Sequence, residues 1–333
     1  MRKKSRLNLL LLAGFVLSLF LCSSALAAPL PPEVLAEFNS IGIATSSIGA
    51  AFHVVGSGFA NVWDTLGVRA AVEVTGGSLQ NCILVNTGQV QSALISQATA
   101  YQAWRAEGMF AGQASMENLR AALPLQSSYI HGWALAPDIL TYRDLGGRIV
   151  SGGPAGGTSE EFNRAILEGL NIVPSRFINA GFADTTGQLS DGLLDAVFCS
   201  LGIPAGAASE ATATLGARII GIHTEDLVRV HQEILPFLVL SELPAGTYAG
   251  QTEALPTLAD LNVYFFHKDV PEYVVYRFVK QSFESKDMLV NTFAGLVAMN
   301  HDNVRNIIMP LHPGAYRFFR EIGAYIPESI IPR

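Results

Sequence analysis

The sequence predicts an α/β protein built from two lobes, each with a mainly parallel sheet flanked by helices. Short apolar runs alternate with helical patterns along most of the chain, which is typical of strand–helix–strand units. The chain has 333 residues, whereas one domain usually has roughly 100–200, so two units are expected. Half of the residues are hydrophobic and 15% are charged, which excludes a disordered or fibrous chain.

The first 27 residues have the parts of an export signal in the usual order. Basic residues at 2–6 precede the 13-residue apolar stretch Leu9–Leu21, and Ala25-Leu26-Ala27 offers a cleavage site. A membrane anchor would need about 20 apolar residues, so this stretch is too short. A lipoprotein signal ending at Cys22 would need a small residue in place of Leu21. We therefore expect cleavage after Ala27 and a periplasmic protein.

The charge balance excludes two classes of partner. The chain has 21 Lys and Arg against 28 Asp and Glu, a net charge of -7. Four basic residues and no acidic one lie in the signal, so the mature chain carries 17 basic and 28 acidic residues, a net charge of -11. Nucleic acids and anionic lipid surfaces both require a basic face. We expect neither as a partner.

The first lobe is predicted from three strand–loop–helix units. Their strands are Ile41–Ala44, Val72–Val74 and Ala93–Ser96, and their helices are 50–66, 79–86 and 97–107. Residues 129–135 then form a strand that crosses to the second lobe.

The second lobe is predicted from four further strands, and the chain then returns to the first lobe. The strands are 148–151, 176–179, 195–199 and 218–222, with a helix that begins at Thr158. After the return, we expect a strand at 261–266 and helices at 271–282, 288–299 and 313–323. Lobe one is thus residues 28–128 plus 243–333, and lobe two is residues 129–242, joined by two crossings that act as a hinge.

Two cysteines remain after cleavage. Cys82 lies in a predicted helix of lobe one and Cys199 in a predicted strand of lobe two. We expect two buried thiols that behave as small hydrophobic side chains rather than a disulfide.

Three loops rich in Gly, Ser and Thr join a strand to a helix, at 45–49, 75–78 and 152–157. Helix N-termini carry free N–H groups and a partial positive charge, so these loops favour an anionic ligand. The run Thr158-Ser159-Glu160-Glu161 also fits a capping box, with Thr158 as N-cap.

No residue pattern predicts catalysis. His223 and His231 are eight positions apart, which is not the spacing of a zinc helix, and the glycine-rich loop lacks the lysine of a phosphate-binding loop. No nucleophile can be paired with a base. We expect no catalytic residue, no metal site and no cofactor.

Several motifs occur in the order found in one known family. They are Pro310-Leu311-His312-Pro313-Gly314-Ala315-Tyr316, Leu243-Pro244-Ala245-Gly246-Thr247-Tyr248, Val74-Thr75-Gly76-Gly77-Ser78, Asp144-Leu145-Gly146-Gly147-Arg148-Ile149-Val150 and Gly202-Ile203-Pro204. On these motifs the chain resembles the solute receptors of TRAP transporters of the TAXI type (TRAP-associated extracytoplasmic immunogenic proteins). The first loop departs from the family's glycine-rich pattern at Ile48 and His53, and the loop before Thr158 lacks a serine.

The resemblance implies a type II periplasmic-binding-protein fold that captures a solute in the cleft between its lobes. The implied solute is a small organic anion such as glutamate or 2-oxoglutarate, and the implied partners are the TRAP permease membrane subunits, with the receptor a monomer. The expected ligand-binding residues are Thr45, Ser46, Ser47, Phe52, Thr75, Ser78, Gln97, Gly156, Gly157 and Thr158. Alternatives are a ligand-presenting sensor subunit or a periplasmic enzyme on the same fold.

Overall fold

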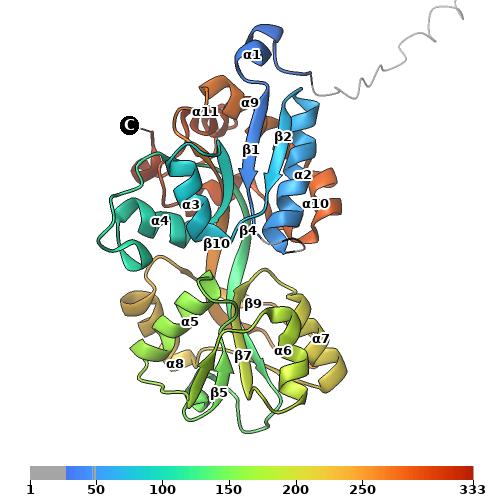
Figure 1. Cartoon of the computed structure of the whole chain (residues 1–333), viewed down its shortest axis with the longest axis vertical. Coiled ribbons are helices and arrows are strands. Elements are labelled where there is room, and N and C mark those ends of the chain that lie inside the picture. Colours follow the sequence, from blue (N-terminus) through green and yellow to red (C-terminus); the bar gives the residue numbers. More distant parts are fainter. Residues whose placement is uncertain (1–27, 47, 49, 333) are drawn as a thin grey trace, which may run out of the picture.

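The computed structural model describes residues 28–46, 48 and 50–332. The predicted export signal, Ser47 and Gly49 lie outside these residues. Two α/β lobes lie one above the other and are connected by two long strands (Figure 1). Within the described part of the chain, no helix combines the length and apolar character needed to cross a membrane.

Ten strands form one continuous sheet that runs through both lobes. In lobe one they are β1 (Ser40–Ala44), β2 (Arg69–Glu73) and β3 (Ser92–Ser96), and in lobe two β5 (Ile149–Ser151), β6 (Arg176–Ile178), β7 (Ala196–Leu201), β8 (Arg218–Ile220) and β9 (Val239–Leu243). The connecting strands are β4 (Leu119–Ala134) and β10 (Leu255–His267). The order is β2-β1-β3-β10-β4-β7-β5-β6, with β8 beside β4 and β9 beside β10.

In lobe one, β1, β2 and β3 are parallel to one another, and in lobe two β5, β6 and β7 are parallel to one another. β10 pairs antiparallel with β3, β4 and β9, and β4 pairs antiparallel with β7 and β8. The mainly parallel sheet predicted for each lobe is therefore present.

Helices cover the sheet in both lobes (Figure 1). The α-helices are α1 (Pro32–Glu37), α2 (Ala51–Thr65), α3 (Ser78–Asn86), α4 (Gln97–Arg105), α5 (Thr158–Gly169), α6 (Phe182–Ser190), α7 (Gly206–Leu215), α8 (Thr224–Arg229), α9 (Glu272–Glu284), α10 (Lys286–Thr292) and α11 (Pro313–Glu321). Shorter helical turns are η1 (Gly108–Phe110), η2 (Tyr142–Leu145), η3 (Val230–Ile234), η4 (Ala294–Ala298), η5 (His301–Asn306) and η6 (Glu328–Ile330).

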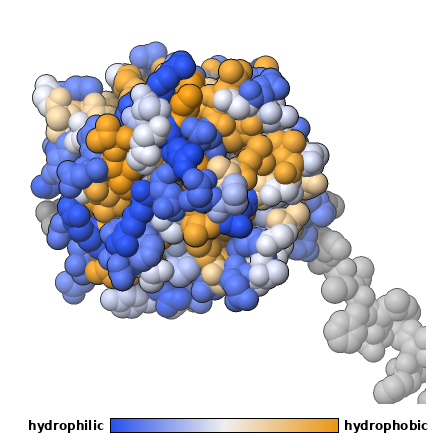
Figure 2. Space-filling model, turned by 90° about the horizontal axis from the view of Figure 1, so that it is seen from below, coloured by the Kyte–Doolittle hydropathy of each residue, from blue (hydrophilic) through white to orange (hydrophobic). Residues whose placement is uncertain are grey.

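Each lobe has its own hydrophobic core. In lobe one, Trp63 stacks on Phe278 with ring centroids 4.3 Å apart, so α2 and α9 pack against each other through aromatic rings. Lobe two has one cluster around Phe198 and another around Trp133, on the two faces of its sheet. Seen from below, the surface of lobe two carries small hydrophobic areas separated by hydrophilic ones (Figure 2).

Two details of the predicted organisation differ from the structure. The helix predicted at 288–299 is broken, because α10 ends at Thr292 and Phe293 is extended before η4 begins. Gly295 leaves room for the Phe293 ring, which would lie 2.5 Å from a Cβ at that position. The core of lobe two also includes Leu243, Tyr248 and Leu258, so it extends beyond the boundary predicted at residue 243.

Candidate functional site

In both lobes, the carboxyl ends of the parallel strands lie on the side that faces the other lobe. β3 begins opposite Phe266 of β10 and ends opposite Asn262, nearer lobe two. β7 begins opposite Ala134 of β4 and ends opposite Tyr129, nearer lobe one. Ligands of open α/β sheets bind beyond the carboxyl ends of the strands. The junction between the lobes is therefore the candidate site.

Helix α4 of lobe one begins at this junction and is fixed there by Asp260 of β10. Ser96 caps the helix by accepting a hydrogen bond from the Thr99 N–H. The Ser96 hydroxyl donates to the Asp260 carboxyl, and the Ala98 N–H donates to the same carboxyl at 3.2 Å. The N-terminus of α4 thus already holds a carboxylate from the protein.

Helix α5 of lobe two also begins at the junction and contacts α4. The hydroxyls of Thr99 and Thr158 lie 3.5 Å apart, one from each lobe. Ala98 is fully buried and packs with the second-lobe core rather than the first. The two lobes therefore meet through the first turns of α4 and α5, one above the other in Figure 1.

The first-lobe loops use most of their predicted ligand-binding groups internally. The Thr45 hydroxyl donates to the Glu73 carbonyl at 2.8 Å. The Thr75 hydroxyl lies within hydrogen-bond distance of the Thr45 carbonyl and of Asn81 Oδ1, and it accepts from the Gly77 N–H. Ser78 Oγ accepts from the Ser96 N–H at 3.0 Å. These contacts tie the ends of β1, β2 and β3 together.

Two predicted residues of the first loop have different environments. Ser46 is the second residue after β1, and its hydroxyl oxygen is buried with no hydrogen-bond partner among the described residues. Phe52 is half-buried and packs on the first-lobe core. Ser47 lies outside the described residues.

The second-lobe loop differs from the predicted capping box. The N-cap of α5 is Gly157, and Thr158 is the first helical residue, without a side-chain cap. Glu160 takes the capping position instead, because its carboxylate accepts the Gly156 N–H at 2.7 Å and binds Arg164. Glu161 is turned toward lobe one and so does not cap the helix.

Gln97 has a structural role that the sequence did not indicate. Its Nε2 donates to the Asn306 carbonyl at 3.0 Å, and its Oε1 accepts the Ile308 N–H at 2.9 Å. The side chain is 2% exposed. Gln97 therefore joins α4 to the segment after η5 through both ends of its amide.

Two further polar groups at the junction were missed from the sequence. Gln126 lies on β4 where it leaves lobe one, and Ser200 lies near the end of β7. Both are buried, and no described residue forms a hydrogen bond with Gln126 Oε1 or Ser200 Oγ. A buried polar group without a partner is unusual and requires an explanation such as a ligand or water. Ser200 could have been found from the sequence, because it lies near the end of a predicted strand, where ligands of such sheets bind.

Two carboxyls lie at the same junction, of which Asp260 is buried and Glu161 is half-buried. Burial raises the pKa of Glu161 to about 7, an effect opposed by a hydrogen bond from Gln102 of α4. Burial also raises the pKa of Asp260 to about 7, opposed by the hydrogen bonds from Ser96 and Ala98 and reinforced by the charge of Glu161. Near neutral pH these groups therefore carry much less negative charge than ordinary carboxylates.

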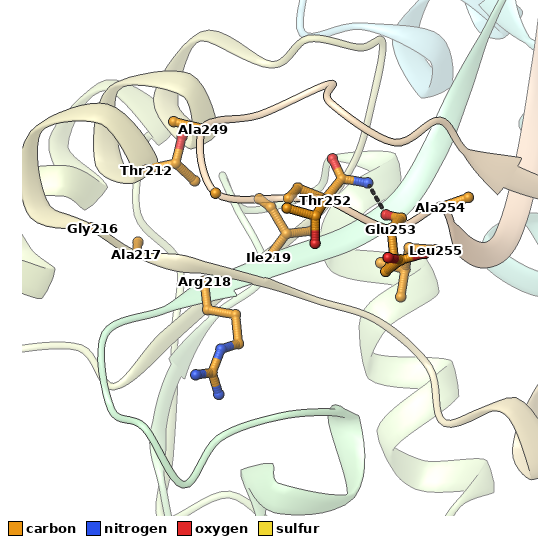
Figure 3. Close-up of a pocket in the computed structure, with 12 residues that line it drawn as sticks. Thr212, Gly216, Ala217, Arg218, Ile219, Ala249, Thr252, Glu253, Ala254 and Leu255 are labelled. Carbon is orange, nitrogen blue, oxygen red and sulfur yellow. Dashed lines mark hydrogen bonds between the residues drawn. The ribbon is translucent and has the colours of Figure 1, made fainter.

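A separate cavity of about 440 Å³ opens in lobe two, away from the predicted site residues (Figure 3). It is lined by Thr212, Gly216, Ala217, Arg218, Ile219, Ala249, Gly250, Gln251, Thr252, Glu253, Ala254 and Leu255. The Arg218 side chain points away from the other labelled residues and donates to the Pro137 carbonyl. This cavity therefore lacks a cation directed into it.

The buried thiols are found as predicted. Cys82 and Cys199 are both free and buried, in the cores of lobe one and lobe two respectively. Cys199 Sγ lies 3.6 Å from Nδ1 of His131, a pairing that the sequence did not show. Burial raises the pKa of Cys199 well above its ordinary value and lowers that of His131 to about 4, so the pair is neutral rather than a thiolate and an imidazolium.

Residues 43–323 match the NMT1-like family. The chain belongs to this family. Solved structures with a similar fold include an ancestral arginine-binding protein bound to arginine, at 13% identity and a TM-score of 0.45, over 78% of this NMT1-like chain and 98% of the other. The periplasmic aliphatic sulphonate binding protein SsuA from Escherichia coli aligns at 12% identity and a TM-score of 0.44, over 85% and 78% of the two chains.

A third similar structure is a TRAP periplasmic solute binding protein from Sulfitobacter sp. NAS-14.1 with bound β-D-galacturonate. It has 9% identity and a TM-score of 0.45, over 86% of this chain and 87% of the other. At these identities the similarity concerns the fold alone. The α/β fold predicted from the sequence is confirmed by the structure itself, with a mainly parallel sheet in each lobe.

Proposed function

We propose that this NMT1-like protein is an extracytoplasmic solute-binding protein that captures a small organic anion between its lobes. The observation that carries the proposal is the junction itself. Two lobes connected by β4 and β10 turn the carboxyl ends of their parallel strands and the N-termini of α4 and α5 toward each other. This arrangement allows the lobes to close on a solute by hinge motion.

The groups proposed to bind the solute are those that have no hydrogen-bond partner within the part of the chain that the structure describes. They are the Ser46 hydroxyl, Gln126 Oε1 and the Ser200 hydroxyl, together with the free N–H groups of the first turn of α5 that begins at Thr158. Helix N-termini favour negative charge. The raised pKa values of Glu161 and Asp260, each about 7, support the same proposal, because a carboxyl that is partly protonated near neutral pH repels an anion less than an ordinary carboxylate does.

Glutamate, 2-oxoglutarate or a similar carboxylate is the proposed solute, and the membrane subunits of a TRAP permease are the proposed partners. Thr45, Thr75, Ser78, Gln97 and Gly156 are then proposed to shape the site rather than to bind through their side chains or N–H groups, because protein acceptors and donors already occupy these groups. Phe52 and Gly157 remain proposed contacts through their surfaces.

The first test identifies the solute. The mature protein is screened by thermal shift against glutamate, glutamine, 2-oxoglutarate and C4-dicarboxylates, and protein purified without refolding is weighed by native mass spectrometry. A ligand at 100 times its Kd stabilises the folded state by about 2.7 kcal/mol, which is a measurable shift. If only neutral or cationic solutes raise the melting temperature, the proposal of an anion is wrong.

The second test uses two neighbouring serines that differ in their bonding. Ser200→Ala removes a buried hydroxyl without a partner, so stability should stay equal or rise while affinity for the identified solute falls. Ser159→Ala removes the oxygen that accepts the Ser200 N–H at 2.9 Å, so it should cost about 1–3 kcal/mol of stability. Ser200 is not in the site if its alanine variant binds the solute as tightly as the wild type.

A further inference from the structure

The glycine-rich loop 152–157, which leads into α5, has little that fixes its conformation from within. Four of its six residues are glycine. Gly153 and Gly156 have φ of +92° and +74°, in a region that glycine enters and leaves at little cost. The hydrogen bond inside the loop, from the Gly157 N–H to the Pro154 carbonyl, is long at 3.3 Å. The loop therefore depends on side chains of neighbouring elements for its conformation.

Two polar side chains bind the loop from outside, one near each end. The Glu160 carboxylate on α5 accepts a hydrogen bond from the Gly156 N–H at 2.7 Å. Asn179, which directly follows β6, donates from Nδ2 to the Gly153 carbonyl at 3.3 Å. The backbone of the loop is thus attached both to the helix that it leads into and to the neighbouring strand.

Arg164 of α5 connects these supports to one another. Its Nε donates to Glu160 Oε1 at 2.9 Å, and its Nη2 lies 3.5 Å from Asn179 Oδ1. Its guanidinium carbon lies 3.7 Å from the centre of the Phe177 ring on β6, which is a cation–π contact. That ring lies against Gly152, where a Cβ would come within 2.5 Å of it. One side chain therefore contacts the partners of the loop at both of its ends.

We propose that Arg164 is a positioning residue for the solute, which holds loop 152–157 so that the N-terminus of α5 faces the junction. The inference rests on the proposed function, because it concerns the same site. Arg164 lies six residues after Thr158, about 9 Å further along the helix axis. Its guanidinium is engaged by Glu160 and Phe177, so it acts on the solute through the loop and not by contact.

The arrangement requires arginine rather than any cation. A planar guanidinium can stack on a ring and donate hydrogen bonds in its own plane at the same time, whereas an ammonium cannot do both. An exposed ion pair alone contributes little to stability, and the Arg164 side chain is 43% exposed. We therefore expect Arg164 to affect the order of the loop and the affinity for the solute more than the free energy of unfolding.

The first measurement follows the loop without any solute. Hydrogen exchange of the Gly156 amide is measured by NMR in the wild type, in Arg164→Leu and in Arg164→Lys. Exchange should be about fivefold to tenfold faster in Arg164→Leu, which is the combined effect of losing an ion pair and a cation–π contact. Arg164→Lys keeps the ion pair but not the stacking, so it should lie between the other two. Exchange that does not change in Arg164→Leu overturns the proposal.

The second measurement is binding. L-Glutamate and 2-oxoglutarate are titrated by calorimetry into the same proteins. Arg164→Leu should bind about fivefold to tenfold more weakly, because a loop that is no longer held must be ordered when the solute binds. Arg229→Leu is the matched control, because Arg229 pairs with Glu233 four residues later and donates to the Gly169 carbonyl at the other end of α5. It should leave both the affinity and the exchange of Gly156 unchanged.

Three outcomes separate this role from others. A merely structural role would lower the free energy of unfolding in urea and leave the affinity of the folded Arg164→Leu protein unchanged, and that result overturns the proposal. An Arg229→Leu protein that binds as weakly as Arg164→Leu also overturns it. If neither glutamate nor 2-oxoglutarate binds the wild type, the proposed solute is wrong, whereas the exchange of Gly156 still decides whether Arg164 holds the loop.

Discussion

Replacing Gln97 by alanine should destabilise the protein strongly, although the residue lies next to the proposed site. The change removes the donor to the Asn306 carbonyl and the acceptor of the Ile308 N–H, at 3.0 and 2.9 Å. Leaving a buried backbone group without its partner costs about 1–3 kcal/mol, so two such groups should cost about 2–4 kcal/mol after partial relaxation. The effect on the free energy of unfolding should exceed any effect on the intrinsic affinity for the solute.

Urea denaturation followed by circular dichroism measures the stability change, and calorimetry on the folded variant measures binding. Gln89→Ala is the matched control, because Gln89 is an exposed glutamine whose amide reaches only the Thr87 hydroxyl among side chains. We expect the control to change the free energy of unfolding by less than about 0.5 kcal/mol. If Gln97→Ala is as stable as this control, the role assigned to the two hydrogen bonds is wrong.

Two further variants or conditions test other parts of the structure. Thr158→Ala should change the free energy of unfolding by less than about 0.5 kcal/mol, because Thr158 is not the N-cap of α5. A loss of about 1 kcal/mol or more in urea denaturation would show instead that Thr158 caps the helix. A thiol reagent should find no reactive cysteine in the folded mature protein and two per chain in denaturant, since Cys82 and Cys199 are buried and free; fewer than two in denaturant would contradict the free thiols.

Much of the fold could be predicted from the sequence because apolar periodicity reflects burial directly. The strands that are buried on both faces, such as β3 and β7, appear as continuous apolar runs and were placed within a few residues. The first half of β4 was missed. Pro124 lies within it, and proline is unusual in the middle of a sheet. The structure accommodates it beside an irregularity in the pairing with β10, between Leu261 and Val263.

The candidate site was harder to predict, because its chemistry depends on contacts between distant residues. Thr158-Ser159-Glu160-Glu161 matches the sequence pattern of a capping box with Thr158 as N-cap. In the structure the N-cap is Gly157, one residue earlier, and Glu161 is directed toward Gln102 of lobe one instead of the start of its own helix. Asp260 lies within an apolar strand, where nothing nearby in the sequence shows that it holds the start of α4.

The motifs behind the family resemblance also have structural roles, which explains why they indicate a fold more clearly than a solute. In the Leu243–Tyr248 motif, the Tyr248 hydroxyl lies 2.8 Å from His131 Nε2 and accepts a hydrogen bond from the Ala205 N–H. This motif therefore stabilises the core of lobe two.

In the Pro310–Tyr316 motif, His312 caps α11 by accepting a hydrogen bond from the Gly314 N–H. A Cβ on Gly314 would lie 2.2 Å from the Glu272 carbonyl oxygen. Only glycine allows α11 to approach α9 so closely. Among the described residues, Ser46 Oγ, Gln126 Oε1 and Ser200 Oγ at the junction have no hydrogen-bond partner. Because no hydrogen bond of the fold depends on these three atoms, we expect their residues to determine which solute a member of this fold selects.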